Sequence, residues 1–135
     1  MAGNIKLEVV TPEKSVVGED VQIVVAPGIV GEFGVLVGHT PFLTALKTGP
    51  LRYKDAKGDE KLVFINGGFA EALPDKVTVL AESAERRRDV DLGRAKSALE
   101  RAQKRLDDRK GVDIDYVRAK AALDRALHRI TVAGM

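Results

Sequence analysis

Proline and glycine are unevenly distributed along the chain, and this limits most strongly how its 135 residues can fold. All five prolines and ten of the 13 glycines lie before residue 84. Both residue types disfavour helix interiors and are common in turns. The change in composition therefore predicts one domain at residues 1–84 and a differently built domain at residues 85–135.

Charge changes at the same place. Residues 1–83 carry 8 basic and 11 acidic side chains, whereas residues 84–135 carry 14 basic and 9 acidic ones, including ten of the eleven arginines. The overall charge of +2 is too small to indicate a nucleic-acid or membrane partner. The absence of cysteine excludes disulfides, thiolate metal sites and a cysteine nucleophile. We also expect no membrane-spanning helix and no signal peptide.

The first part has the pattern of an antiparallel β-sandwich. Short runs rich in β-branched residues recur about every eight to twelve residues and are separated by Gly, Pro, Asn and Asp. Hairpin turns are expected at residues 56–59, 66–68 and 74–76. The expected strands are Ile5–Val10, Val21–Val25, Val35–Val37, Leu51–Lys54, Lys61–Ile65, Phe69–Leu73 and Val77–Leu80.

The second part contains a repeat of helical character. Val90–Lys96 returns as Ile114–Lys120, and the 24-residue offset persists to the end of both copies. Asp91 and Asp115 suit helix starts, where a carboxylate can cap free N–H groups. A short break around Gly111 then predicts an antiparallel two-helix hairpin. The fold class is therefore α+β, with an N-terminal antiparallel β-sandwich followed by this hairpin.

Alanine dominates the apolar stripe of each expected helix. At helical spacing, the first stripe holds two alanines and two leucines, and the second holds two alanines, a leucine and an isoleucine. Such helices can approach closely but bury little apolar area. We therefore expect the hairpin to exchange between docked and extended forms. The stripes are Ala95, Leu99, Ala102 and Leu106, then Ala119, Leu123, Ala126 and Ile130.

Each helix also carries a row of arginines beside this stripe. One interpretation is a solvated surface whose arginines are satisfied by nearby carboxylates and water. The other is an anion site, because guanidinium groups bind phosphate or carboxylate in bidentate fashion. Both interpretations stay open, as does the choice between a phosphate and an acidic protein segment. The rows are Arg94, Arg101 and Arg105, then Arg118, Arg125 and Arg129.

Residues suited to catalysis are scarce. His39 and His128 are the only histidines, and they are too far apart in sequence to suggest metal-ligand spacing. Gly28–Gly34 lacks the lysine of a phosphate-binding loop. No serine lies in a nucleophile-elbow context. We therefore expect no catalytic residues, no metal and no required cofactor, and an enzyme acting alone is not favoured.

One long stretch resembles a known family. Gly31–Leu46, which reads GEFGVLVGHTPFLTAL, resembles the signature of the epsilon subunit of F-type ATP synthases. Phe64–Glu71, Val77–Ala81 and the C-terminal hairpin resemble the same family in the same order. The resemblance covers essentially the whole chain.

The resemblance implies a non-catalytic coupling and regulatory subunit of the central stalk. Such a subunit binds gamma and rests on the c-ring, and its helices can reach an acidic segment of beta in the alpha/beta head to restrain ATP hydrolysis. It is peripheral to the cytoplasmic face of an energy-coupling plasma or inner membrane. Glu32 and His39 fall where family members contact the c-ring.

The resemblance also implies a regulatory ATP site. Some members bind ATP on the folded hairpin through an Ile-Asp-x-x-Arg-Ala motif, and this chain has valine in place of the isoleucine. Gly93 departs from a good helix former and is expected to loosen the first turn. The candidate ATP-binding residues are Glu85, Val90, Asp91, Arg94, Ala95, Arg101, Arg118, Arg125 and Arg129.

Two other functions remain as alternatives. The first is a free-standing interaction module whose basic helical arm binds an acidic partner. The second is nucleic-acid binding through the basic hairpin. Against the second, only Tyr116 among the six aromatic residues lies there, so stacking on bases has almost no platform.

Overall fold

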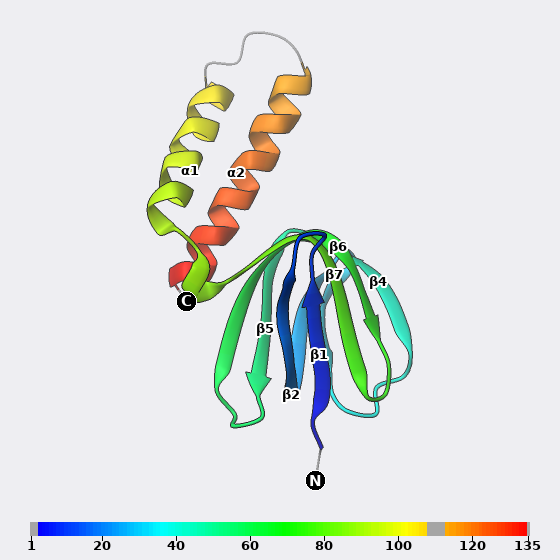
Figure 1. Ribbon diagram of the computed structural model, residues 1–135. Coiled ribbons are helices and arrows are strands. Elements are labelled where there is room, and N and C mark those ends of the chain that lie inside the picture. The colour runs from blue at the N-terminus through cyan, green and yellow to red at the C-terminus, as the bar shows by residue number, and fades with distance from the viewer. Residues whose placement is uncertain (1–2, 108–112, 135) are drawn as a thin grey trace. The chain divides into compact units, whose positions relative to one another are not determined.

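The computed structural model describes residues 3–107 and 113–134, and it divides into two compact units, Met1–Arg87 and Arg88–Met135. The first unit contains seven strands and the second two helices (Figure 1). The strands are β1 (Ile5–Val10), β2 (Ser15–Gly28), β3 (Gly31–Val35), β4 (Phe42–Leu46), β5 (Gly49–Asp55), β6 (Glu60–Ala72) and β7 (Lys76–Arg86). A 3-10 turn, η1 (Arg87–Asp89), precedes α1 (Leu92–Asp107) and α2 (Asp113–Gly134).

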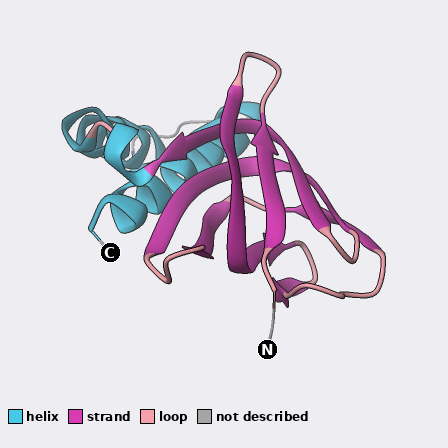
Figure 2. Cartoon of the chain, turned by 60° about the horizontal axis from the view of Figure 1, so that its bottom comes forward, coloured by secondary structure: helices cyan, strands magenta, loops and turns pink. Residues whose placement is uncertain are grey.

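The strand pairings of the first unit close on themselves. β1 pairs with β2, β2 with β5, β5 with β6, β6 with β7, and β7 with β1. The long strands β2 and β6 extend beyond this ring, where β2 pairs with β3 and β6 with β4. Figure 2 shows the strands of this unit, in magenta, as strongly curved ribbons. The β1–β7 pair is parallel and the others are antiparallel. The expected β-sandwich is confirmed, with one parallel pair that the strand pattern did not predict.

The interior of this unit is apolar. Alternate residues of β1 and β7 point inward, as strand geometry requires, and their β-branched side chains fill the space between the strands. Tyr53 is the largest buried side chain. Other fully buried members of this core are Ile5, Leu7, Val9, Val21, Val24, Val35, Leu51, Val63, Ile65, Val77 and Val79.

Several strand boundaries differ from those expected. β2 and β7 run well beyond the predicted segments. β2 pairs in succession with the short strands β1, β5 and β3, and β7 pairs along most of its length with the long strand β6. Val35–Val37 is not a strand: β3 ends at Val35, and Leu36 and Val37 follow it as exposed residues. β4 was not predicted, because Phe42–Leu46 has no clear alternation and becomes a strand through its pairing with β6.

The turn expected at residues 66–68 was also wrong. Residues 60–72 form one continuous strand whose register with β7 is unchanged on both sides of the two glycines. Gly67 and Gly68 have φ angles of 67° and 119°. These angles suit glycine, so the pair distorts the strand without reversing it. The other two expected turns are present, at residues 56–59 and 74–76.

The second unit is the expected two-helix hairpin. Asp91 caps α1: its Oδ1 accepts a hydrogen bond from the Arg94 N–H at 3.0 Å. Ala95, Ala102, Ala119 and Ala126 are at most 3% exposed, whereas the leucines of the stripes are half-buried. The helices therefore meet along the predicted alanine seam. The side chain of Asp115 and the break around Gly111 lie outside the described residues.

Candidate functional site

Glu32 lies on β3, opposite Pro27 of β2. Its Oε1 accepts a hydrogen bond at 2.7 Å from Nη2 of Arg52, which lies on β5. The Glu32 side chain is still 52% exposed. This first candidate is therefore a surface carboxylate held by one arginine, an arrangement suited to meeting a basic or hydrogen-bond-donating partner.

His39 lies in a turn that the backbone holds firmly. Its N–H donates to the carbonyl of Leu36 at 3.2 Å, and the N–H of Gly38 donates to the carbonyl of Pro74 at 2.7 Å. The His39 Nδ1 lies 2.6 Å from the carbonyl oxygen of Thr40, so this nitrogen carries the donated hydrogen. The turn presents its histidine with little freedom of the backbone.

Aromatic contacts connect this turn to β3. The rings of His39 and Phe42 are 6.2 Å apart between centroids, and those of Phe42 and Phe33 are 5.2 Å apart, both edge to face. Phe33 packs against the core, and neighbouring residues of a strand point to opposite faces. The structure thus brings His39 to the Phe33 side of β3 and places Glu32 on the opposite face.

A second surface feature is an apolar row across four strands. Val10, Leu80, Phe69 and Ala45 are successive register partners on β1, β7, β6 and β4. Phe69 is 57% and Leu80 56% exposed, while Val10 and Ala45 are half-buried. Sequence reasoning missed this apolar row, because in a single strand Phe69 or Leu80 cannot be told from a core residue.

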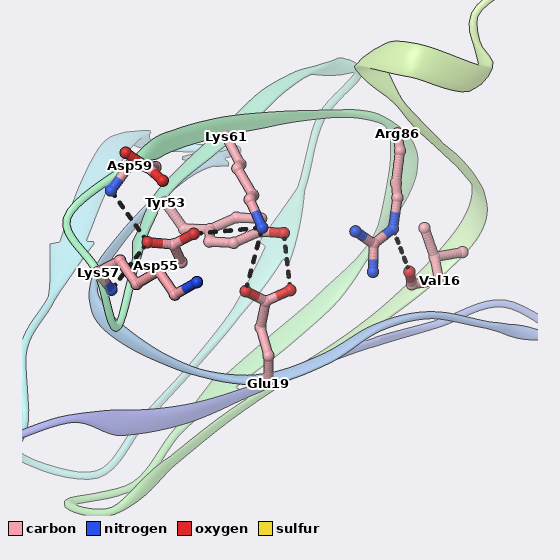
Figure 3. A network of polar contacts seen from close by, with 8 residues as sticks. All are labelled: Val16, Glu19, Tyr53, Asp55, Lys57, Asp59, Lys61 and Arg86. Atoms are coloured by element: carbon pink, nitrogen blue, oxygen red, sulfur yellow. Dashed lines mark hydrogen bonds and ion pairs between the residues drawn. The ribbon is translucent and has the colours of Figure 1, made fainter.

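A polar network lies where the ends of β2, β5 and β6 approach one another (Figure 3). Lys61 Nζ lies 3.6 Å from Glu19 Oε1 and 3.2 Å from Asp55 Oδ2, and the Tyr53 hydroxyl donates to Glu19 Oε2 at 3.3 Å. In the same view, the Arg86 Nε donates to the carbonyl of Val16 at 2.8 Å.

Two groups in this network have shifted pKa values. Burial, reinforced by the negative charge of Glu19, raises the pKa of Tyr53 from 10.0 to about 12. Burial also acts to raise the pKa of Asp55. Hydrogen bonds from the N–H groups of Asp59 and Lys57, together with the ammonium of Lys61, outweigh it and lower that pKa below 3.8. These two shifts belong to a network that connects β2, β5 and β6 with the β5–β6 hairpin.

The candidate ATP-binding residues are divided between the two units. Glu85 lies on β7, opposite Phe64 of β6, and the other eight belong to the helical unit. Arg94, Arg101 and Arg118 are exposed. Arg125 and Arg129 are half-buried, as is Val90 just before the capping Asp91. Ala95 is buried in the seam and can contribute only through its backbone.

The hairpin also has two shallow apolar grooves that sequence reasoning did not identify. One, of about 570 Å³, is lined by both helices and the other, of about 510 Å³, by α2; they share Leu123 and Leu127. No candidate arginine lines either groove. Over residues 3–107 and 113–134, no cluster of three or more possible metal ligands occurs, and no helix has the length and apolarity to span a bilayer.

Two family models cover nearly the whole chain. The β-sandwich domain of the ATP synthase delta/epsilon chain matches residues 4–87, and the long α-helix domain of the same chain matches residues 88–134. The chain belongs to the ATP synthase delta/epsilon chain family. The resemblance seen in the sequence is thereby confirmed.

Curated relatives of this delta/epsilon-family chain carry the name ATP synthase epsilon chain. The one from Desulfatibacillum aliphaticivorans is 69% identical over 110 residues, which is 82% of this chain and 78% of the relative. The one from Desulfosudis oleivorans is 64% identical over 107 residues, covering 79% of this chain and 80% of the relative.

Solved structures share the fold at low identity. A chain of the Euglena gracilis mitochondrial ATP synthase, in a structure of OSCP, F1 and the c-ring, matches with a TM-score of 0.78 and 24% identity, covering 90% of this chain and 76% of that one. A chain of the Tetrahymena thermophila mitochondrial ATP synthase central stalk and c-ring matches with a TM-score of 0.63 and 13% identity, covering 98% of both chains.

Proposed function

We propose that this chain is a non-catalytic coupling and regulatory subunit in the central stalk of a proton-translocating F-type ATP synthase. Its β-unit docks on gamma and on the c-ring, and its helical hairpin restrains ATP hydrolysis. The chain is held at the cytoplasmic face of the plasma or inner membrane through the complex. Family membership supports this proposal, and the surface of the β-unit gives it a physical basis.

The apolar row is the observation that carries the docking proposal. An isolated exposed apolar side chain is ordinary, but here two exposed and two half-buried apolar side chains lie in register across neighbouring strands and form a continuous strip that favours contact with another protein. The strands beneath are fixed by their ladders, so binding orders little backbone. We assign this strip to gamma.

The docking proposal is tested by capture of gamma. A tagged full-length chain carrying Phe69→Ser or Leu80→Ser is expected to retain its fold, because both side chains are more than half exposed. The amount of gamma that it captures is expected to fall at least about tenfold. Lys57→Ser, an exposed change in the β5–β6 hairpin, is the control and is expected to capture gamma normally. Equal capture by all variants refutes this surface. A chain that never co-purifies with the complex favours the free-standing interaction module.

The turn of His39 and the edge strand carrying Glu32 supply the second contact. Both side chains reach solvent and rest on backbone that hydrogen bonds hold in place. A contact with a rotating ring must transmit torque without unfolding the segment that makes it. Side chains carried on hydrogen-bonded backbone meet this requirement. We therefore assign Glu32 and His39 to the c-ring interface.

The helical unit suits a switch because its two helices hold each other weakly. Alanine side chains fill the seam, and each buries far less apolar area than a leucine would. Separating the helices therefore costs little, and contacts with gamma and with an acidic segment of beta can replace the seam. The exposed arginines supply complementary charge, which mainly guides orientation and encounter.

ATP is proposed to act on the equilibrium between the docked and the extended hairpin. A nucleotide that binds the docked hairpin better than the extended one shifts the population toward the docked form. Titration calorimetry of the full-length chain is expected to show heat with ATP, weakened about tenfold or more by Arg94→Ala and by Arg125→Ala. Lys96→Ala, an exposed change on α1, is the control. Absence of heat at millimolar ATP removes the ATP site and leaves the docking proposal standing.

Restraint of hydrolysis is tested separately. Adding the full-length chain to synthase heads stripped of their own epsilon subunit is expected to slow ATP hydrolysis. The variant Arg118→Gln with Arg125→Gln is expected to slow it less, because the charges that meet the acidic segment are gone. Unchanged hydrolysis with the unaltered chain contradicts the regulatory role.

A further inference from the structure

Arg52 is more rigidly placed than the carboxylate it binds. On β5 it is flanked on both sides, by its register partners Val25 of β2 and Leu62 of β6. Glu32 lies on β3, for which the described residues give one neighbouring strand, β2. The ion pair therefore ties an edge strand to an interior strand, with the arginine as the fixed partner.

The pair leaves half of the carboxylate available. Arg52 binds Oε1 of Glu32 at 2.7 Å, and the described part of the chain provides no second polar contact for that side chain. Gly34, the next residue on the same face of β3, has no side chain to cover the pair. The exposed fractions of 35% for Arg52 and 52% for Glu32 keep both groups accessible from solvent.

A glutamate alone on a surface samples several rotamers and loses that freedom when it binds. A carboxylate already held by one oxygen loses less, and its second oxygen has a defined direction. A guanidinium serves this purpose better than an ammonium, because its planar donors fix the orientation of the bound oxygen.

We propose that Arg52 is a positioning residue for the docking contact made by Glu32. It holds Oε1 so that Oε2 faces a basic or hydrogen-bond-donating loop of the partner. This inference rests on the proposed function, in which Glu32 contacts the c-ring. Arg52 acts through Glu32 and makes no required contact of its own.

The test uses the full-length chain titrated onto membranes that carry a synthase stripped of its own epsilon subunit. Half-saturation of binding and the number of protons pumped per ATP are measured for Glu32→Gln, Arg52→Met, the double variant and Arg52→Lys. Arg52→Met is expected to weaken binding about two- to fivefold, and the double variant to bind no worse than Glu32→Gln alone. Arg52→Lys is expected to recover part of the loss.

Lys54→Met is the matched control, because Lys54 lies two residues along the same strand, on the same face and exposed. It is expected to bind normally, and thermal unfolding is expected to be unchanged in every variant. Losses from Arg52→Met and Glu32→Gln that simply add, or that accompany a lower melting temperature, overturn the positioning role. If Glu32→Gln weakens binding and Arg52→Met does not, only this inference fails. If Glu32→Gln has no effect, the c-ring contact of Glu32 in the proposed function fails with it.

Discussion

A Cβ atom on Gly68 would lie 2.0 Å from the carbonyl oxygen of Leu80, on the neighbouring strand β7. It would also lie 2.8 Å from the Cα of Ala81. Both obstacles are backbone atoms of a paired strand, which cannot move aside as a flexible side chain can. Gly68 therefore allows β6 and β7 to remain in register beneath the exposed side chains of Phe69 and Leu80.

Gly68→Ala is expected to lower the free energy of unfolding by at least about 2 kcal/mol, because it adds this clash to a φ of 119° that alanine disfavours. Urea unfolding followed by circular dichroism measures it. Gly18→Ala is the control, since a Cβ there meets nothing within 4 Å. A loss below about 0.5 kcal/mol for Gly68→Ala contradicts the close approach.

Gly67 and Gly68 show where the fold can be predicted from the sequence and where it cannot. Alternation of β-branched residues identified β1 and the paired strands around residues 56–59, since burial on one face leaves a local signal. Asn66-Gly67-Gly68 has the local composition of a turn, and only the pairing with β7 reveals that the strand continues through it without reversing. Phe42–Leu46 likewise becomes a strand through pairing with β6, which no local pattern records.

Tyr53 makes stability depend on alkaline pH. Its pKa is raised from 10.0 to about 12, so the folded state keeps the phenol protonated where the unfolded chain loses the proton. The contribution of about 3 kcal/mol is full below pH 10 and is lost as the pH rises from 10 to 12. Free energies of unfolding across that range are expected to fall more steeply for the unaltered chain than for Tyr53→Phe. Tyr116→Phe is the control, and a profile unchanged by Tyr53→Phe contradicts the shift.

Asp55 acts at the acidic end. Its pKa is lowered from 3.8, so its carboxylate stabilises the fold above that value and the contribution is lost as the pH falls through the lower folded-state pKa. Asp55→Asn keeps an acceptor for the N–H groups of Lys57 and Asp59 and removes the charge. Its unfolding free energy is expected to vary less than that of the unaltered chain below pH 4. Asp75→Asn, in the exposed β6–β7 turn, is the control. If the unaltered chain, Asp55→Asn and Asp75→Asn lose stability equally below pH 4, the lowered pKa of Asp55 is not the source of the acid sensitivity.

Asp91 is expected to set the stability of the first turn of α1. Asp91→Ala removes the acceptor of the Arg94 N–H and is expected to destabilise the helix by about 1 kcal/mol. Amide hydrogen exchange at residues 94–96 is then expected to quicken about fivefold, while exchange in β1 stays the same. Ser97→Ala, an exposed change within α1, is the control. Equal exchange rates in Asp91→Ala and the unaltered chain contradict the cap.

The candidate sites were predicted unevenly for a similar physical reason. The 24-residue repeat located the cap of Asp91 and the alanine seam, because both depend on neighbours within one or two helical turns. Arg52 could not be connected with Glu32 in this way. The two are 20 residues apart, and their contact exists only because β2 places β3 and β5 on either side of itself.

A larger side chain in the alanine seam is expected to weaken the docked hairpin. Ala102 is 1% exposed between α1 and α2, so Ala102→Leu forces extra methyl groups into a closely packed contact. The docked hairpin is expected to lose about 1–3 kcal/mol, seen as faster amide exchange in both helices with unchanged exchange in the β-unit. Ala121→Leu, at an exposed position of α2, is the control for helix propensity and added bulk. If the hairpin restrains hydrolysis in its extended form, Ala102→Leu is also expected to strengthen that restraint, because separating the helices relieves the overpacking. If Ala102→Leu speeds amide exchange in both helices but does not slow ATP hydrolysis further, packing of the alanine seam does not control the restraint of hydrolysis.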